Sequence, residues 1–420
     1  MPNPDHPTRS KNQKGNKRAI FVFLGAHNFW EGLYDTVNIG FIRCLIDFKI
    51  IHDVDILMTT IIPDGVSQKR LKELAGKEEQ LQSFAQNHSC QMHYYHIQGR
   101  TIKGLLSASR EISQFIQKYD RRFIWAQNYF NTQIGVLIKK RTQSNLHFDM
   151  RGLVPQEELH HSSANIISRI TKFIVLKGVE RINIKNADSI STVSKRFKEY
   201  IESKYRLKDQ EIEILPNYFD PNQFFINENL REHYRQKLQV SKNQKIILYS
   251  GMLQKWQDPE LLFSFLKNIQ DQDIHQEYKF LVLTYDQVKA SHFSNNFGIR
   301  DLIIESAPVD EINGLYNAAD IGLAFRDANI ASIVASPVKI PEYLATGNSL
   351  ISLESIGDFG QELVDKPYTL IKKNRTEILN ILLDEIRKIK QPSPSDLQEI
   401  YQSFSYINNR EALQRIITNL

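Results

Sequence analysis

Short apolar runs alternate with amphipathic helical patterns along almost the whole chain, and this alternation constrains the fold more than any other feature. Continuous apolar runs are typical of strands that are buried on both faces of a sheet. Repeated strand–helix units predict parallel sheets with helices on both faces, an α/β fold. In the first part of the chain the expected strands are residues 18–24, 54–62, 91–97, 122–126, 145–150 and 188–193.

The second part of the chain repeats this style with a new series of strands. These are expected at residues 245–250, 279–284, 301–305, 320–325, 349–353 and 368–371. The stretch 216–244 between the two series is polar and poor in strand patterns, which places a domain boundary nearby. We therefore divide the chain into a basic tail, two α/β domains and a C-terminal helical segment that can pack on either domain, at 1–17, 18–225, 226–395 and 396–420.

Helical patterns lie between the expected strands, for example at 102–118, 132–140 and 258–269. The last of these has a clear beginning, because Asp258 can cap it, Pro259 suits the first helical position and Glu260 suits the positive end of the dipole. Its apolar residues form one stripe that predicts packing on a sheet.

Composition excludes several classes of protein. Apolar residues make up 41% and charged residues 24% of the 420 residues, which is ordinary for a globular chain with a large core. The net charge of +5 fits an anionic small ligand, an anionic membrane surface or no charged partner. Outside the tail there is no concentrated basic patch, so we expect no nucleic-acid partner.

Neither cysteine belongs to a CxxC pair, so we expect Cys44 and Cys90 to be buried thiols rather than disulfide or zinc ligands. No apolar run reaches 18 residues, and the tail 1–17 has basic residues but no apolar stretch of a secretory signal. These features indicate a cytoplasmic protein. We expect the tail to be disordered and solvated, with peripheral contact to the inner face of an anionic membrane as the alternative.

Several common catalytic motifs are missing from the sequence. No GxGxxG follows an expected strand, and GxxxxGK[ST], HExxH and GxSxG do not occur. The sequence therefore gives no motif support for a dinucleotide oxidoreductase, a P-loop NTPase, a zinc protease or an α/β-hydrolase.

The segment 326–347, with the sequence RDANIASIVASPVKIPEYLATG, carries the densest set of candidate site residues. We expect a short helix capped by Ser336, with Pro337 as its first residue and its N-terminus facing the crevice at the carboxyl ends of the strands. Free N–H groups there, together with the charge of Lys339, make an anion site, and Glu342 follows on the same face. A surface helix with a Lys–Glu pair is the plainer alternative. Pro341 falls inside this expected helix, so a kink is also expected.

Other loops should reach the same crevice. Gly251 follows a strand and lets a ligand approach the backbone closely. Lys255 can reach the phosphates of a ligand that is bound at the anion site described above. In the first domain, His27 and Asn28 follow the first strand, and a charged segment follows the strand 145–150. These residues can orient an acceptor, but a structural histidine and a solvated loop are equally compatible with the sequence.

Four passages together resemble family 4 of the retaining glycosyltransferases. The passages read NADSISTVS at 186–194, ILPNYFD at 214–220, LYNAADIGL at 315–323 and SPVKIPEYLATG at 336–347. They are similar to the family's patterns ADxIxTVS, PNGVD, LYxAADxxL and SPxKxxEYLAxG. The resemblance covers about half of the chain in recognisable pieces, mostly within 186–365.

The resemblance implies the GT-B fold, in which two Rossmann-like, doubly wound domains face a central cleft. It implies metal-independent sugar transfer with no cofactor, from a donor that is a UDP-sugar or, as an alternative, a GDP-sugar. Glu342 would hold the ribose of the donor, and Lys255, Arg326 and Lys339 would neutralise its diphosphate. Pro308 and Val309 would meet the base through their backbone, beside the candidate phosphate-side residues Gly251, Ser336 and Pro337.

On the acceptor side, the segment 149–152 is similar to a DxRG turn that faces the acceptor and the transferred sugar. Its charged residues and those just beyond it are candidates for acceptor contact: Asp149, Arg151, Glu157 and Glu158. Two departures from the family pattern stand out. The earlier of the family's two glutamates is replaced by Val334, and the usual Gly-Arg after the first strand of the second domain is Gly251-Met252.

The expected function is retaining transfer of a sugar to a glycan or lipid-linked acceptor during the synthesis of a surface polysaccharide such as capsule, lipopolysaccharide or exopolysaccharide. Two alternatives remain open at this point. One is a GT-B epimerase that acts on sugar nucleotides, and the other is a non-catalytic protein that binds them. The substitution at Val334 is the feature that sustains the second alternative.

Overall fold

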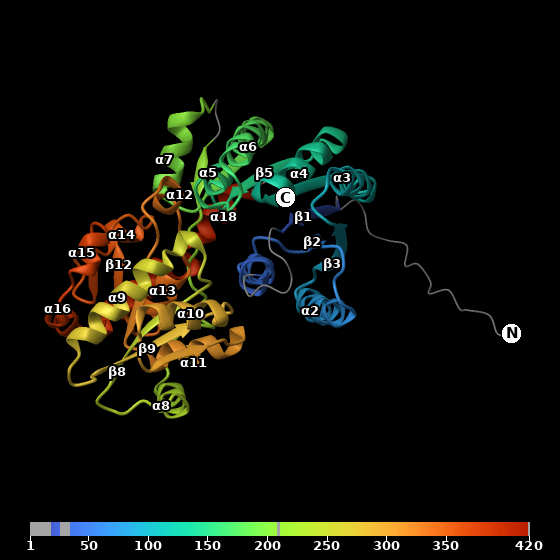
Figure 1. Ribbon diagram of the computed structural model, residues 1–420. Helices are drawn as coiled ribbons and strands as arrows, with labels where there is room; N and C mark the ends of the chain where they lie inside the picture. The colour runs from blue at the N-terminus through green and yellow to red at the C-terminus, as the bar shows by residue number, and fades with distance from the viewer. Residues whose placement is uncertain (1–17, 26–33, 208–210, 419–420) are drawn as a thin grey trace.

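The computed structural model describes residues 18–25, 34–207 and 211–418, which form two parallel sheets with helices around them (Figure 1). The first sheet has the strand order β3-β2-β1-β4-β5-β6-β7. Its strands are β1 (Ala19–Leu24), β2 (Asp55–Ile62), β3 (Gln91–Gln98), β4 (Arg121–Gln127), β5 (Asn145–Met150), β6 (Ser189–Thr192) and β7 (Ile212–Ile214). We call the part of the molecule built on this sheet the N-terminal half. The predicted tail 1–17 lies outside the described residues.

Alternate residues of β1 serve two separate cores, because successive side chains of a strand point to opposite faces. Phe21 and Phe23 pack in one core with helices α1 (Gly40–Asp47) and α2 (Gln68–Gln86). Ile20 and Val22 pack in the other with α3 (Ile102–Ile116) and α4 (Asn128–Thr142). The remaining long helices of this half are α5 (Val154–His161), α6 (Ile166–Asn186) and α7 (Lys195–Lys204).

The second sheet has the order β10-β9-β8-β11-β12-β13 and is also parallel throughout. Its strands are β8 (Lys245–Ser250), β9 (Tyr278–Leu283), β10 (Leu302–Glu305), β11 (Ile321–Ala324), β12 (Ser349–Leu353) and β13 (Thr369–Lys372). The helices around it are α8 (Glu228–Lys237), α9 (Pro259–Gln272), α10 (Gln287–Phe297), α11 (Val309–Ala318), α12 (Ile330–Ile333), α13 (Lys339–Ala345), α14 (Phe359–Glu362), α15 (Arg375–Leu379) and α16 (Leu383–Lys388). We call this part the C-terminal half.

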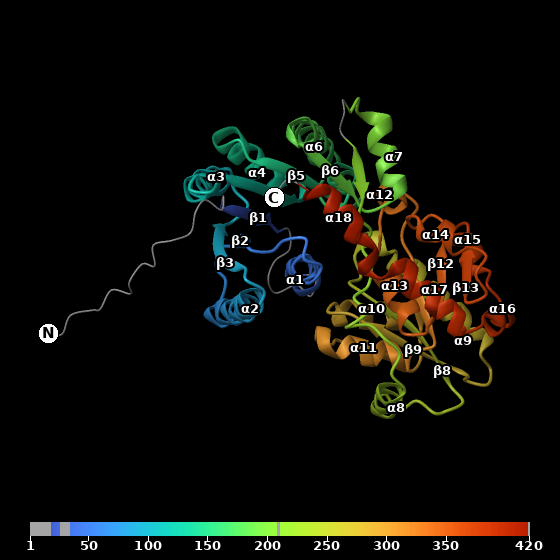
Figure 2. The same cartoon turned by 180° about the vertical axis from the view of Figure 1, so that it is seen from behind.

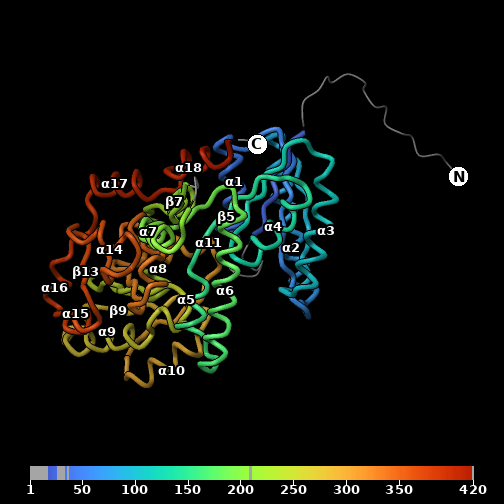
Figure 3. The backbone as a smooth tube through the Cα atoms, turned by 90° about the horizontal axis from the view of Figure 1, so that it is seen from above, coloured from blue at the N-terminus to red at the C-terminus, as the bar shows by residue number. Residues whose placement is uncertain are grey.

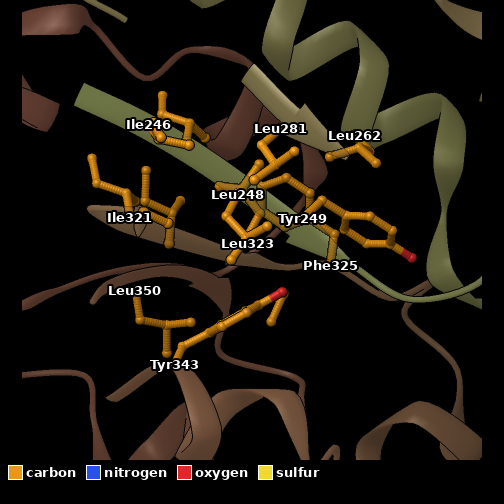
Figure 4. Packing of buried hydrophobic residues seen from close by; sticks show 14 of the residues in the cluster. Ile246, Leu248, Tyr249, Leu262, Leu281, Ile321, Leu323, Phe325, Tyr343 and Leu350 are labelled. Atoms are coloured by element: carbon orange, nitrogen blue, oxygen red, sulfur yellow. The ribbon is translucent and has the colours of Figure 1, made fainter. Parts of the chain in front are cut away.

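The core of the C-terminal half forms between the central strands and the helices packed on both faces. Figure 4 shows Leu248 of β8 and Leu323 of β11 at its centre, with Leu262 of α9 and Tyr343 of α13 packed near them. All four side chains are almost completely shielded from water. Asp258 caps α9 by accepting from the Leu261 N–H, with Pro259 as the first helical residue, which confirms the predicted beginning of this helix.

Most predicted strands are confirmed to within a residue or two, and β5, β8 and β12 have the predicted bounds. The short strand β7 was missed because its three residues, Ile212–Ile214, give no pattern that can be distinguished from a loop. None of the helices that the structure describes combines the length and the apolar character that crossing a bilayer requires.

The C-terminal segment connects the two halves, as Figure 2 shows. Helix α17 (Pro394–Phe404) packs on α13 of the C-terminal half. The chain then passes Phe219 at Ser405, and α18 (Arg410–Ile416) places Leu413 and Ile416 in a core of the N-terminal half. The two halves are therefore linked by two neighbouring chain crossings.

Candidate active site

Both sheets change winding direction at their centre, between β1 and β4 and between β8 and β11. Ligands of open parallel sheets bind at such points, beyond the carboxyl ends of the strands. A cavity of about 820 Å³ lies between the two halves. Its lining includes Arg151 from the N-terminal half and Pro308, Val309, Val338 and Glu342 from the C-terminal half. The structure thus brings several predicted site residues to one cavity.

Gly251 follows β8 with a φ of 137°, in a region of backbone space that favours glycine. A Cβ atom at this position would stand 3.0 Å from Nζ of Lys339. The absence of a side chain at Gly251 therefore lets a lysine ammonium group lie against the backbone at the end of a central strand.

Lys339 begins α13 and is only 8% exposed. Its Nζ donates to Oε1 of Gln257 at 3.2 Å and lies 4.3 Å from the centroid of the Tyr249 ring. Burial and, to a smaller extent, the charge of Arg326 lower the pKa of Lys339 to about 7, and the charge of Glu342 opposes this shift. No carboxylate among the described residues forms an ion pair with this lysine within salt-bridge distance, so an anion in the cleft would meet a cation with little competition.

Glu342 lies one turn after Lys339 on α13 and lines the cavity. Burial raises the pKa of its carboxyl to about 8, whereas the charge of Lys339 and a hydrogen bond from the Tyr316 hydroxyl lower it. Helix α13 therefore presents a buried cation and, one turn later, a partly buried carboxyl group that lines the cavity, which is the arrangement expected for a phosphate and a ribose contact.

Arg326 follows β11, and its charge acts on Glu157 of α5 in the other half of the molecule. Burial lowers the pKa of the Arg326 guanidinium, and the Glu157 charge opposes the shift. The surrounding protein raises the pKa of Glu157, with Arg326 as the largest opposing charge. The Nε of Arg326 is buried and has no hydrogen-bond partner among the described residues. This nitrogen is therefore a hydrogen-bond donor that the described part of the protein leaves without an acceptor.

The expected beginning of the helix at Ser336 and Pro337 is wrong, because α13 begins at Lys339 and has no side-chain cap. The Ser336 hydroxyl instead accepts from the Asn217 N–H at 3.0 Å, and the Asn217 side chain donates to the Ser336 carbonyl at 2.8 Å. These two hydrogen bonds connect Asn217, where the chain crosses between the two halves, to the loop that precedes α13. The later start also removes the reason for a kink at Pro341, which lies in the first turn, where no intrahelical donor is needed.

Lys255 is exposed and begins a short 3₁₀ helix, Lys255–Gln257. Its Nζ donates to the carbonyl oxygen of His160 at 3.4 Å, across the cleft. It therefore lies in the same loop as Gln257, the partner of Lys339, but its amine points to the N-terminal half in this structure.

The predicted acceptor-side residues occupy different positions. His27 and Asn28 lie outside the described residues. Asp149 is fully buried, and its carboxylate accepts from Trp125, Gln127, Arg151 and Ser191. Asp149 therefore holds the side chain of Arg151 in position. Because Asp149 is fully buried, the expectation that it faces an acceptor does not fit the structure.

Arg151 lines the cavity, where it donates to Oδ1 of Asn217 at 2.6 Å. Glu158 pairs with Lys172 of α6 at 2.7 Å and does not line the cavity. Sequence reasoning did not single out Asn217, Gln257 or Tyr316. Asn217 and Tyr316 nevertheless belong to the passages that carry the family resemblance, which was a usable signal for both.

Polar contacts hold the two halves together beside the site. Ser194 donates to the Val334 carbonyl at 2.7 Å, and Asp358 accepts from the backbone N–H of Lys195 at 2.6 Å. Nε2 of His161 lies 2.8 Å from Oδ2 of Asp327. The Val334 side chain is 1% exposed and packs in a core made mostly by the N-terminal half. The position at which the resembled sequence pattern has a glutamate is thus part of the inter-domain contact.

Comparison with solved structures shows the same architecture over nearly the whole chain. Anabaena HepE in complex with UDP and glucose is 15% identical, with a TM-score of 0.65 over 96% of this chain and all of that chain. The chain has the GT-B fold. Sucrose-phosphate synthase from Thermosynechococcus elongatus, with 12% identity and a TM-score of 0.67, shares this GT-B fold over 96% of this chain and 98% of that chain.

The same GT-B fold occurs in WaaG, a glycosyltransferase involved in lipopolysaccharide biosynthesis, at 14% identity and a TM-score of 0.61. That comparison covers 96% of this chain and all of WaaG. No protein-family model and no curated protein sequence matches the chain. The described residues contain no group of three metal-binding side chains.

Proposed function

We propose that this GT-B protein is a retaining glycosyltransferase of family 4. It moves a sugar from a nucleoside-diphosphate sugar to a glycan or lipid-linked acceptor in the synthesis of a surface polysaccharide, and acts in the cytoplasm without a metal. The observation that carries the proposal is the position of Lys339, buried against Gly251 at the centre of the second sheet, with Glu342 one turn away in the inter-domain cavity.

The cations at the carboxyl edge of the second sheet suit a diphosphate. The charge of Arg326 lowers the pKa of Lys339, so the two cations are close enough to repel each other. A diphosphate placed near both groups would relieve that repulsion. Arg326 also has an unpaired Nε, which supplies a directed hydrogen-bond donor.

Sugar transfer breaks the bond between the anomeric carbon and the diphosphate oxygen and forms one to the acceptor oxygen. The departing diphosphate gains negative charge as that bond breaks. Cations held in place by the protein stabilise this charge more than they stabilise the intact donor, which lowers the barrier. The acceptor proton passes to the departing phosphate, so no dedicated base is required and we assign none.

The base and the ribose would occupy the part of the cavity lined by Pro308, Val309 and Glu342. The backbone of residues 308–309 can read a base edge, and the carboxyl of Glu342 can bond to ribose hydroxyls. We favour a uridine nucleotide, with a guanosine nucleotide as the alternative. The support for uridine is that the solved complexes of HepE contain UDP and UDP-glucose.

A non-catalytic sugar-nucleotide-binding protein is the second candidate, and Val334 is the observation that favours it. A glutamate stands at this position in the family pattern, whereas here a buried valine packs on the N-terminal half. A protein of this kind would bind the same nucleotides without turnover.

Two measurements separate these functions. Thermal unfolding with UDP, GDP or ADP should reveal a preferred nucleotide, and a ligand at 100 times its Kd stabilises the protein by about 2.7 kcal/mol. Release of nucleotide from a panel of UDP- and GDP-sugars, with and without lipid-linked or glycan acceptors, then tests turnover. Binding with turnover supports the transferase, binding without turnover supports the second candidate, and formation of an epimerised donor without transfer supports an epimerase. A protein that binds none of the nucleotides would refute the proposal.

A further inference from the structure

Helix α6 (Ile166–Asn186) exposes an apolar face to water along most of its length. Figures 1 and 3 show it on the outside of the N-terminal half, where its neighbours are α4 and α5. The outward side chains are between 45% and 75% exposed: Ile166, Ile167, Ile170, Ile174, Val175 and Ile182. Spacings of three, four and seven residues place them on one side of the helix, which we call the outer face of α6.

The opposite side of α6 is already packed on the protein. Glu180 and Asn183 are buried there. The Glu180 carboxylate accepts from the hydroxyls of Tyr129 and Tyr205, which fixes the orientation of the helix. A surface helix with one side anchored in this way ordinarily presents polar residues on the other. Scattered apolar residues on a surface are common, but a row of six on one helix marks a site of interaction.

Charge on the same helix indicates what covers this face. The only acidic residue of α6 is Glu180, which is buried. Arg181 and Lys185 are exposed beside the apolar row and form no ion pair among the described residues. The outer face thus combines apolar side chains with cations and contains no carboxylate.

We propose that the outer face of α6 docks on an anionic lipid bilayer. The isoleucines would enter the boundary between headgroups and acyl chains, and Arg181 and Lys185 would meet lipid phosphates. A second copy of the chain offers a poorer partner, because the same face of the other copy brings no carboxylate for these cations. The bilayer supplies both an apolar phase and the opposite charge.

The docking surface is connected to the cleft through α5. Lys172 of α6 pairs with Glu158 of α5 at 2.7 Å. At the end of α5, His161 contacts Asp327 of the C-terminal half. A bilayer under α6 would therefore lie near the mouth of the cleft and present a lipid-linked acceptor to it. This link to the acceptor rests on the proposed function, whereas the docking surface does not.

The test is flotation of the full chain with vesicles of phosphatidylcholine alone or with 30% phosphatidylglycerol. Binding is expected only to the anionic vesicles and should weaken at high salt. Arg181→Glu/Lys185→Glu should reduce the apparent affinity by at least roughly 25-fold, because each basic residue near such a surface contributes a factor of roughly five. Ile170→Glu/Ile174→Glu should reduce it by roughly tenfold or more.

The matched control is Ile274→Glu/Val288→Glu, which places the same charges at two residues of the C-terminal half that are 85% and 87% exposed. All variants should keep the melting temperature and the stabilisation by UDP. Equal vesicle binding by the α6 variants and the wild type, or no vesicle binding at all, would overturn the proposal. A dimer in solution that Ile170→Glu/Ile174→Glu separates would assign the face to a second copy instead. Vesicle binding without nucleotide binding would preserve this surface and refute the proposed function.

Discussion

Nζ of Lys339 lies 4.3 Å from the centroid of the Tyr249 ring, at the closed end of a site that also holds Arg326. The ring offers the ammonium group only a weak partner compared with a carboxylate. Because burial and Arg326 lower the pKa of Lys339 to about 7, the free protein carries a partly neutral lysine near physiological pH. Nucleotide binding should therefore be linked to proton uptake.

The first prediction concerns the pH dependence of UDP binding. A bound diphosphate favours charged Lys339 and raises its pKa, so affinity is highest below pH 7 and falls as the pH rises above 7. Glu342, whose pKa is raised to about 8, acts in the same direction because its ionised form repels the diphosphate. The affinity should fall by up to about tenfold per pH unit for each proton taken up on binding.

Calorimetric titration with UDP between about pH 7 and 8.5 measures this slope, in a range where the diphosphate is largely ionised. In Lys339→Gln the affinity should be lower and the slope should be smaller. An unchanged slope in this variant would show that Lys339 does not face the diphosphate.

The second prediction is that Glu342→Ala weakens donor binding. A ribose contact is made equally in the ground state and the transition state, so its loss should raise KM for the donor roughly 10-fold to 100-fold with a smaller change in kcat. Steady-state kinetics with the preferred sugar nucleotide measure both constants. Glu342 lines the cavity and is not part of the apolar core, so the variant should keep its fold, which the melting temperature checks. A loss confined to kcat would assign Glu342 to the chemistry instead of the ribose.

The third prediction is that Lys255→Ala lowers the rate of sugar transfer by roughly 10²–10³, the usual effect of removing one group that stabilises a developing anion. The side chain is exposed, so the fold should be unaffected. Lys267→Ala, at a second lysine of the C-terminal half that pairs with Asp271, is the control and should retain full activity. Full turnover by purified Lys255→Ala would show that its contact with the His160 carbonyl is its only role.

The fourth prediction is that Val334→Glu destabilises the protein and gives no gain in activity. The family pattern suggests that a glutamate here would restore function, but the valine is 1% exposed and packs in an apolar core. Burying a carboxyl there should lower the free energy of unfolding by about 2–4 kcal/mol. Val334→Leu should change it by less than about 1.5 kcal/mol. A stable and more active Val334→Glu would mean that this side chain can turn into the cleft.

The fifth prediction concerns Asp358, which holds the start of α7 from the opposite half of the molecule. Its carboxylate accepts from the N–H groups of Lys195 at 2.6 Å and Arg196 at 3.3 Å. Asp358→Ala should lower the free energy of unfolding by about 0.5–2 kcal/mol, as the loss of a helix cap does. Urea unfolding measures this change, and Asp358→Asn, which keeps one acceptor oxygen, should lose less. Small-angle scattering should show a wider spread of domain arrangements in the alanine variant.

The sequence by itself determined the two parallel sheets and the loops that reach the crevice. Strand β8 contains the continuous apolar run 246–249 between Lys245 and Ser250, whereas β5 and β12 interleave apolar and polar residues, and in all three the local pattern was enough to predict a strand. Gly251, Lys339 and Glu342 were predicted to face the crevice because parallel strands place their carboxyl ends at one edge. Local sequence also gave the capped beginning of α9 at Asp258.

Only the tertiary structure decided which polar groups were already occupied. Ser336 was predicted as a cap, yet its hydroxyl accepts from Asn217, which is 119 residues away in sequence. Asp149 was predicted to face an acceptor, yet side chains from β4, β6 and the following loop enclose it. The sequence of α6 likewise does not reveal which side of the helix faces water, and only the structure shows that its outer face is exposed. Hydrogen-bond partners and burial depend on residues distant in the chain, whereas strand and helix patterns depend on neighbours.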